Sequence, residues 1–371
     1  MTEAQLPALT QAVLAGAFVL SVLFGALVQA TGFCTMGAIS DVAAMGDWTR
    51  LRQWALAAAV AMLGFAVLAA TGVVTPAQTL YASTEWRWLS ALAGGALFGF
   101  GMVLASGCVS KNLVRAGGGS LRSLVVVLVT GIAAFATLRG VTAVLRTQTV
   151  DRVAIDFAGN ADLGTVLADA TGVAPGTAAL AAGLVLGLLL LAFSLASRDS
   201  RRPLNLLAGG GIGALVLGMW WVTGQLGHLA EHPLTLEESW LATNSSRAEG
   251  FSFVAPTAYA LDWLIFFSDA SKRLTVGVIS VAGVVLGSAA MALARRDFRW
   301  EGFAGTPDLG HHLAGATLMG VGGVTAIGCT IGAGITGIST LSLTSFVAVA
   351  AIIAGALAGV KYQVWRVERA A

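Results

Sequence analysis

Long apolar segments alternate with short polar ones along almost the whole chain. A helix needs about 20 consecutive apolar residues to cross the hydrocarbon core of a bilayer. The pattern therefore predicts an all-α polytopic membrane protein with about nine transmembrane helices, over residues 8–29, 54–74, 89–107, 121–141, 174–196, 204–224, 274–294, 312–328 and 343–362.

Four further apolar stretches are too short to span a bilayer and too apolar to be exposed loops. Irregular backbone survives at membrane depth only where protein or a cavity surrounds it. These stretches are therefore predicted to form short re-entrant helices, over residues 33–45, 108–120, 253–268 and 329–341.

The chain repeats part of its own sequence at a shift of 221 residues. A slightly different shift places Cys34 on Ser252. The shift of 221 equates Gly94 with Gly315, Leu97 with Leu318, Gly99 with Gly320, Gly101 with Gly322, Ala105 with Ala326, Gly107 with Gly328, and Cys108 with Cys329.

This similarity predicts two repeats, each with four spans and two re-entrant turns. The first covers residues 8–145 and the second covers residues 204–363, with a connecting loop and one linking span over 146–203. A single linking span places the two halves in opposite orientations. Inverted repeats of this kind are typical of transporters, whose binding site lies near the membrane midplane where the repeats meet.

Composition agrees with a membrane protein and excludes several other classes. Hydrophobic residues make up 57% of the chain and charged residues 11%, against roughly 25% charged in soluble domains. The net charge of +2 gives no sign of nucleic-acid binding. The ATP-binding P-loop, the HExxH zinc motif and the GxSxG serine motif are absent from the sequence. No cofactor or metal is therefore expected, and the chain is not expected to be an enzyme.

Lysine and arginine predict the orientation. With the N-terminus outside, fourteen basic residues lie on the cytoplasmic side and seven outside. Because cytoplasmic loops carry the excess of basic residues, the N-terminus is expected outside and the C-terminus in the cytoplasm.

The three cysteines of the chain share a glycine-rich sequence context. Cys34, Cys108 and Cys329 each follow a glycine by nine residues. A second glycine lies one or two residues before each thiol, at Gly32, Gly107 and Gly328. Free cysteine is often buried as a small hydrophobic residue, but matched contexts at repeat-related positions favour a functional role. A serine such as Ser252 more often serves only its own turn.

The predicted location of these residues suits an anion that contains sulfur. The N-terminus of a short helix offers free N–H groups and a positive partial charge. A thiol adds a weak donor and a polarizable sulfur atom. Lys111 and Arg115 follow Cys108 by three and seven residues, so they draw an anion toward the cytoplasm or serve only as basic anchors of the positive-inside rule.

The chain resembles the YeeE/YedE family of bacterial inner-membrane proteins. The similar stretches are residues 32–38, 105–115, 252–256 and 326–334, which contain the three cysteines and Ser252. The resemblance implies an hourglass-shaped bundle of nine spans with re-entrant helices. It also implies uptake of thiosulfate along Cys34, Cys108 and Cys329 by S–H···S hydrogen bonds, with a separate cytoplasmic TusA-like sulfurtransferase as partner.

Other interpretations stay open at this point. A membrane sulfurtransferase would form a cysteine persulfide and needs a thiol of lowered pKa, yet no histidine or acid pairs obviously with a cysteine. Related proteins handle other sulfur species or selenium, and a structural subunit with inert thiols is the third alternative. No aspartate or glutamate stands out as a proton relay in the membrane, which favours facilitated movement over proton symport.

Overall fold

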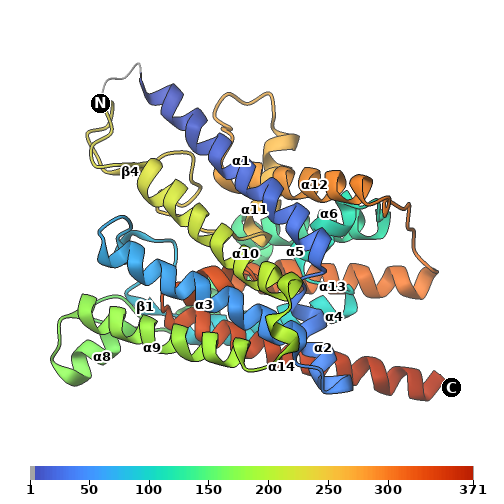
Figure 1. Cartoon of the computed structure of the whole chain (residues 1–371). Coiled ribbons are helices and arrows are strands. Elements are labelled where there is room, and N and C mark those ends of the chain that lie inside the picture. The colour runs from blue at the N-terminus through green and yellow to red at the C-terminus, as the bar shows by residue number, and fades with distance from the viewer. Residues whose placement is uncertain (1–4, 371) are drawn as a thin grey trace.

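Nine long helices run roughly side by side in the structure, which is a computed structural model that describes residues 5–370 (Figure 1). Eight of them are long and apolar enough to span a membrane. The ninth, α13, begins with a polar turn that contains Asp308, His311 and His312. The nine helices are α1 (Leu6–Thr31), α3 (Thr49–Ala70), α4 (Trp88–Leu104), α6 (Leu121–Arg139), α9 (Pro175–Leu195), α10 (Pro203–Trp221), α12 (Val276–Ala294), α13 (Thr306–Thr325) and α14 (Leu343–Ala370).

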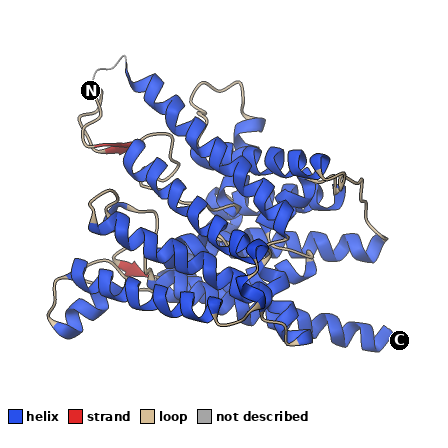
Figure 2. Cartoon of the chain, in the orientation of Figure 1, coloured by secondary structure: helices blue, strands red, loops and turns tan. Residues whose placement is uncertain are grey.

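Shorter elements connect these helices, and the prediction of an all-α membrane protein is confirmed (Figure 2). Strands β1 (Glu85–Trp86) and β2 (Ile155–Asp156) form one antiparallel pair. Strands β3 (His228–Leu229) and β4 (Ser239–Trp240) form another. The short helical elements are α2 (Thr35–Met45), η2 (Pro76–Gln78), α5 (Val109–Gly117), α7 (Val141–Gln148), η3 (Val150–Arg152), α8 (Leu163–Thr171), η4 (Asp199–Arg201), η5 (Val222–Leu226), α11 (Val254–Ile265) and η6 (Gly332–Gly337).

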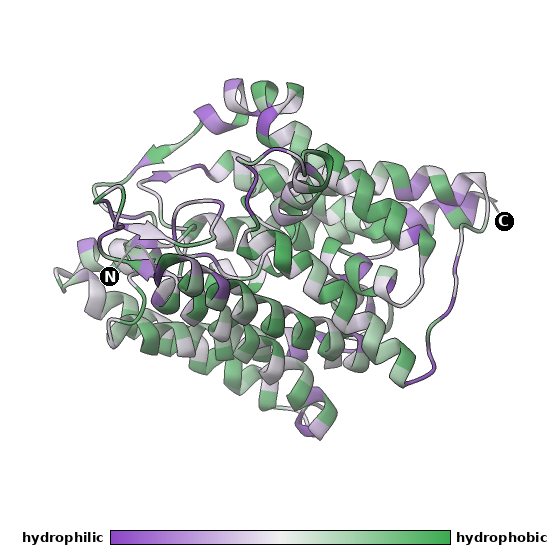
Figure 3. Ribbon diagram, turned by 90° about the horizontal axis from the view of Figure 1, so that it is seen from above, coloured by the Kyte–Doolittle hydropathy of each residue, from purple (hydrophilic) through white to green (hydrophobic). Residues whose placement is uncertain are grey.

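The outer face of the bundle is apolar, whereas its two ends are polar (Figure 3). Ile132 on α6 and Leu189 on α9 are 63% and 62% exposed. Large apolar side chains in such positions are costly in water but favourable against lipid. The start of α1 and the end of α14 lie at opposite ends of the bundle (Figure 1).

Glycine allows α4 and α13 to touch through their backbones. A β-carbon on Gly94 would lie 2.7 Å from the carbonyl oxygen of Gly322, and one on Gly315 would lie 2.6 Å from that of Gly101. Residues early in one helix therefore meet residues late in the other, so the two helices run antiparallel. Small residues permit this close approach between membrane helices.

The remaining helix pairs follow a matching pattern. Helix α4 packs on α14 and α13 packs on α6, while α1 packs on α12 and α10 packs on α3. The pairs correspond when the two halves of the chain are exchanged. The pair of α4 with α14 then becomes the pair of α13 with α6, and the pair of α1 with α12 becomes the pair of α10 with α3. We therefore propose that the two sequence repeats form an inverted pair about the contact of α4 with α13.

Several boundaries differ from the sequence prediction; helix α14, for example, continues to Ala370, eight residues beyond its predicted end. Helix α13 begins at Thr306, six residues earlier than predicted, because Pro307 is favourable in a first turn and Asp308 complements the helix dipole there. The stretch 329–341 contains the π-helical turn η6 instead of a short α-helix. Its three glycines, Gly332, Gly334 and Gly337, disfavour the regular helix.

The α4–α13 contact predicts opposite effects of one substitution at two glycines of α13. Gly315→Ala would place a methyl group against the α4 backbone, and overpacking of this kind costs about 1–3 kcal/mol. Gly310 has nothing within 4 Å of a β-carbon, so Gly310→Ala is expected to stabilise the helix by about 0.5–1 kcal/mol. Thermal unfolding in detergent measures both. Equal midpoints for the two variants would contradict the contact.

Candidate functional site

The same backbone turn follows both α4 and α13. Ser106 and Ile327 both have φ of 56°, and the glycines after them, Gly107 and Gly328, have φ of 156° and 158°. A branched residue such as Ile327 rarely adopts positive φ. A strained conformation that occurs twice, each time two residues before a cysteine, indicates that the turn serves the thiol position.

Cys108 is the N-cap residue of α5, and its side chain is only 2% exposed. Its sulfur lies 3.2 Å from the hydroxyl oxygen of Ser110. The Asn112 amide donates to the carbonyl oxygens of Gly107 and Cys108, at 2.8 and 3.1 Å. The turn is therefore held from α5 itself, which fixes the direction of the thiol.

Cys34 is the N-cap residue of α2 and is half-buried. Gly32 ends α1 in the left-handed conformation, with φ of 68°, which a glycine adopts without steric cost. The chain then reverses, and the sulfur of Cys34 accepts a hydrogen bond from the N–H of Gly37 at 3.4 Å. Cys34 is thus placed at a helix N-terminus, as the sequence predicted.

Cys329 is fully buried, and backbone N–H groups converge on its sulfur. The N–H of Gly332 donates to it at 3.3 Å. The backbone N–H groups of Ile331 and Phe253 also donate hydrogen bonds to the sulfur. Convergent N–H groups favour negative charge, so this position suits an anion as well as a thiol.

Ser252 does not occupy the same capping position as Cys34. The N-cap of α11 is Phe253, and Ser252 stands one residue before it. Its hydroxyl oxygen lies beside Gly332, 2.6 Å from where a β-carbon on that glycine would be. Ser252 therefore lies next to the Cys329 turn. The repeat in the sequence predicted instead that Ser252 would occupy the position equivalent to that of Cys34.

The three thiols form a series with Cys108 in the middle. Cys108 lies close enough to Cys34 to interact with it electrostatically, and it has the same relation to Cys329. The structure thus brings the three predicted thiols together. Cys108 is thus the thiol that neighbours both of the others, and the order Cys34, Cys108, Cys329 is called the thiol line below.

Basic side chains surround one end of this line. Lys111 and Arg115 lie within electrostatic range of Cys34, and Arg50 lies within electrostatic range of Lys111. Arg115 donates to the carbonyl oxygen of Ser106 at 2.7 Å. Within residues 5–370, Lys111 forms no ion pair and no side-chain hydrogen bond. Its ammonium group is therefore available to an anion.

Asp41, whose place relative to the thiols is not evident from the sequence, belongs to this basic end. Its carboxylate lies 3.4 Å from the Arg50 guanidinium. The guanidinium also lies beside Gly37, at the first turn of α2. Asp41 thus holds Arg50 near Cys34, and it is not itself placed against a thiol.

A cavity of about 270 Å³ opens at the other end of the line. Gly328 and Ser252 form part of its wall, next to the Cys329 turn. Glu249 also lines it and is only 8% exposed. Sequence reasoning missed Glu249 because it lies in a polar loop with other glutamates, where only its neighbour Gly250, aligned with Gly32, indicated a special position.

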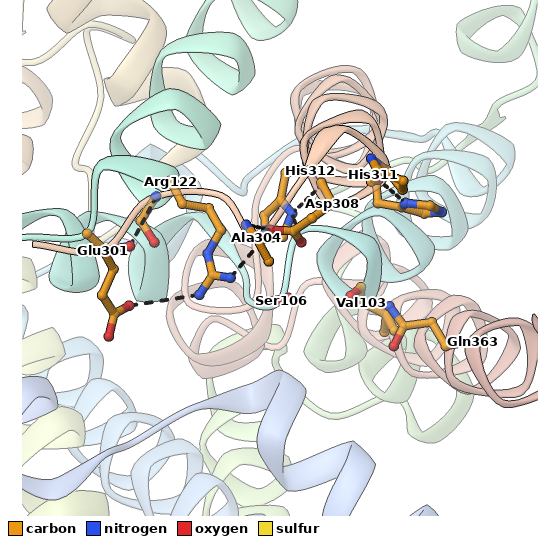
Figure 4. A network of polar contacts seen from close by, with 12 residues as sticks. Val103, Ser106, Arg122, Glu301, Ala304, Asp308, His311, His312 and Gln363 are labelled. Atoms are coloured by element: carbon orange, nitrogen blue, oxygen red, sulfur yellow. Dashed lines mark hydrogen bonds and ion pairs between the residues drawn. The ribbon is translucent and has the colours of Figure 1, made fainter. Parts of the chain in front are cut away.

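A polar network lies at the end of the bundle near Ser106 (Figure 4). Arg122 forms ion pairs with Glu301 and Asp308, at 3.8 and 3.7 Å. Asp308 in turn lies 3.1 Å from Nδ1 of His312. These contacts link α6 to the start of α13 and to the loop before it, so they hold the helix ends around the Ser106 turn.

Apolar helices around three cysteines, of which Cys108 and Cys329 are buried, define an integral membrane protein with thiols in its interior. The chain belongs to the sulphur transport family, whose model matches residues 30–358. The thiosulfate transporter TsuA of Escherichia coli (strain K12) is 28% identical over 322 residues, which are 84% of each chain. TsuA of Spirochaeta thermophila is 25% identical over 334 residues, covering 88% of this chain and 92% of that protein.

The burial of the thiols predicts their order of reaction with a maleimide. In variants that keep one cysteine each, half-buried Cys34 is expected to react at least about tenfold faster than Cys108 or Cys329, because only accessible thiolates react. Mass spectrometry of the folded protein in detergent gives the rates, and the denatured protein supplies the reference. Cys329 reacting as fast as Cys34 would contradict the buried position.

Proposed function

We propose that the protein takes up thiosulfate across the bacterial inner membrane, through a path lined by Cys34, Cys108 and Cys329. The proposal rests on two observations taken together: the similarity to named transporters and the arrangement of the thiols. Two relatives named thiosulfate transporters align with more than four fifths of the chain. The aligned chain holds three thiols in one line between a cavity and an unpaired lysine.

The chemistry of the path suits thiosulfate better than a hard anion. Thiol S–H groups donate weakly, and their sulfur atoms are polarizable like the terminal sulfur of the substrate. Several weak sites in series let an ion enter and leave again. The thiols therefore stay reduced and pass the anion from one to the next by S–H···S hydrogen bonds.

The direction of movement follows from the two ends of the line. Thiosulfate enters the cavity beside Ser252 and Cys329, crosses at Cys108 and leaves past Cys34 and Lys111. The basic end then lies in the cytoplasm, with the N-terminus outside and the C-terminus inside, as the distribution of lysine and arginine favours. A cytoplasmic TusA-like sulfurtransferase would receive the anion there.

The membrane potential opposes this movement. One charge crossing 100 mV corresponds to about 2.3 kcal/mol, so an inward dianion faces about 4.6 kcal/mol per 100 mV when the inside is negative. Lys111 and the N–H groups at Cys329 offset the loss of hydration along the path. They do not remove the cost of the potential, which a concentration gradient of the anion or a coupled cation has to offset.

Replacing Cys108 tests the series of thiols. Cys108→Ala removes the middle donor, and loss of one hydrogen bond of about 1–1.5 kcal/mol predicts about a tenfold lower uptake rate. Cys108→Ser keeps a donor and is expected to retain more activity. Uptake of labelled thiosulfate into proteoliposomes measures both. Uptake by Cys108→Ala at the wild-type rate would refute the relay, and a persulfide on Cys108 during turnover would favour a sulfurtransferase.

Lys111 is expected to attract the anion by its charge. Lys111→Met is predicted to raise the KM for uptake at least about tenfold, because a hydrogen bond to a charged group contributes about 1.5–3 kcal/mol. Lys361→Met removes an exposed lysine of α14 and serves as the control with the same charge change. An equal change of KM in both variants would show only a general effect of charge.

A further inference from the structure

Glu249 stands between η5 and α11 in the wall of the cavity next to Cys329. Its backbone is fixed by Thr223, whose hydroxyl group donates to the Glu249 carbonyl oxygen at 2.7 Å and accepts from its N–H at 3.2 Å. The side chain therefore keeps its position in the wall. It places a buried carboxylate where an anion is to enter.

Backbone groups satisfy only one side of this carboxylate. The N–H groups of Asn244 and Ser245 both donate to Oε1 of Glu249, at 3.0 and 2.7 Å. The hydroxyl group of Ser245 also forms a hydrogen bond with the carboxylate. Because both amides donate to Oε1, the other oxygen, Oε2, is the atom that can carry a proton.

No basic side chain in the described part of the chain pairs with Glu249. The two arginines that line the same cavity are paired elsewhere, Arg87 with Glu85 at 2.8 Å and Arg146 with Asp151 at 3.0 Å. Glu249 is thus a buried carboxylate without a counter-charge, which is a costly state when it is ionised.

Two tyrosines are the titratable groups that act on Glu249 from neighbouring elements. Tyr259 of α11 lines the cavity, and Tyr81 is buried within electrostatic range of Glu249 and Cys329. Both interact electrostatically with Glu249. The Tyr81 hydroxyl group donates to the Gly332 carbonyl oxygen at 2.7 Å, so Tyr81 links the acidic wall of the cavity to the Cys329 turn.

The protonation state of Glu249 decides how the cavity meets an anion. Ionised, the carboxylate repels thiosulfate; protonated, it becomes a hydrogen-bond donor to a thiosulfate oxygen. Burial raises the pKa of Glu249 above its ordinary value, against the opposite effect of the hydrogen bonds from Ser245 and Asn244. The protonated form is therefore favoured as the pH outside falls.

We propose that Glu249 is a proton-binding site of the entry cavity and that it couples thiosulfate uptake to the inward movement of a proton. This inference rests on the proposed function. The proton comes from the outer solution and binds Oε2 when the anion enters; in the same cycle it dissociates from Oε2 to the inner solution, which returns Glu249 to its ionised form. One proton per dianion halves the net charge that moves against the membrane potential.

Accumulation of labelled thiosulfate in proteoliposomes at a clamped membrane potential tests the coupling. With one proton per anion, each unit of pH difference, acid outside, raises the wild-type accumulation ratio about tenfold. Glu249→Gln keeps the shape and the acceptor for both amides, and it is expected to lose this dependence. Glu249→Asp keeps a carboxylate and is expected to retain it.

The matched control is Glu231→Gln, which removes an exposed carboxylate of the same loop and is expected to behave as wild type. A pH dye trapped inside the vesicles adds a measurement on the unaltered protein: thiosulfate entry should acidify the interior. Wild-type uptake without acidification, or Glu249→Gln with the full pH dependence, would overturn the proposal. A wild-type protein that takes up no thiosulfate at any pH would instead refute the proposed function itself.

Discussion

The backbone contact between α4 and α13 is the constraint on which the site depends. The two helices run antiparallel and touch at glycines, such as Gly94 against Gly322. Each helix is followed by a turn that leads to a cysteine, and the glycine contacts bring both turns to the same helix pair. This is how Cys108 and Cys329, which are 221 residues apart in sequence, come within electrostatic range. A larger residue at the contact would separate the helices and with them the thiols.

Much of this arrangement could be predicted from the sequence, because it depends on local physical rules. The long helices follow from apolar length, and the turns at Cys34 and Cys108 follow from glycine at helix ends. The cysteines themselves were evident from their matched contexts. The membrane class, the all-α fold and the family are confirmed, while the repeat boundaries and the roles of the site residues stay proposals.

The features that sequence reasoning missed depend on contacts between distant segments. Glu249 looks like any glutamate of a polar loop, and only the fold places it in a cavity wall. The one-residue offset of Ser252 against Cys34 is invisible because both follow the same Gly-Phe pair. In the same way, the ion pair of Asp41 with Arg50 joins α2 to α3 and needs the positions of both helices.

Symmetry of the backbone combined with asymmetry of the side chains distinguishes the two ends of the proposed path. The turns at Cys108 and Cys329 have nearly the same backbone angles. Three residues after each thiol, however, one repeat has Lys111 and the other has Gly332. The lysine provides a positive charge at one end of the path, whereas the glycine leaves room for Ser252 and Tyr81 beside Cys329. In the proposed path, a cation attracts the anion at one end, and at the other end a carboxylate faces the entry cavity. Two turns of similar backbone thus carry different chemistry.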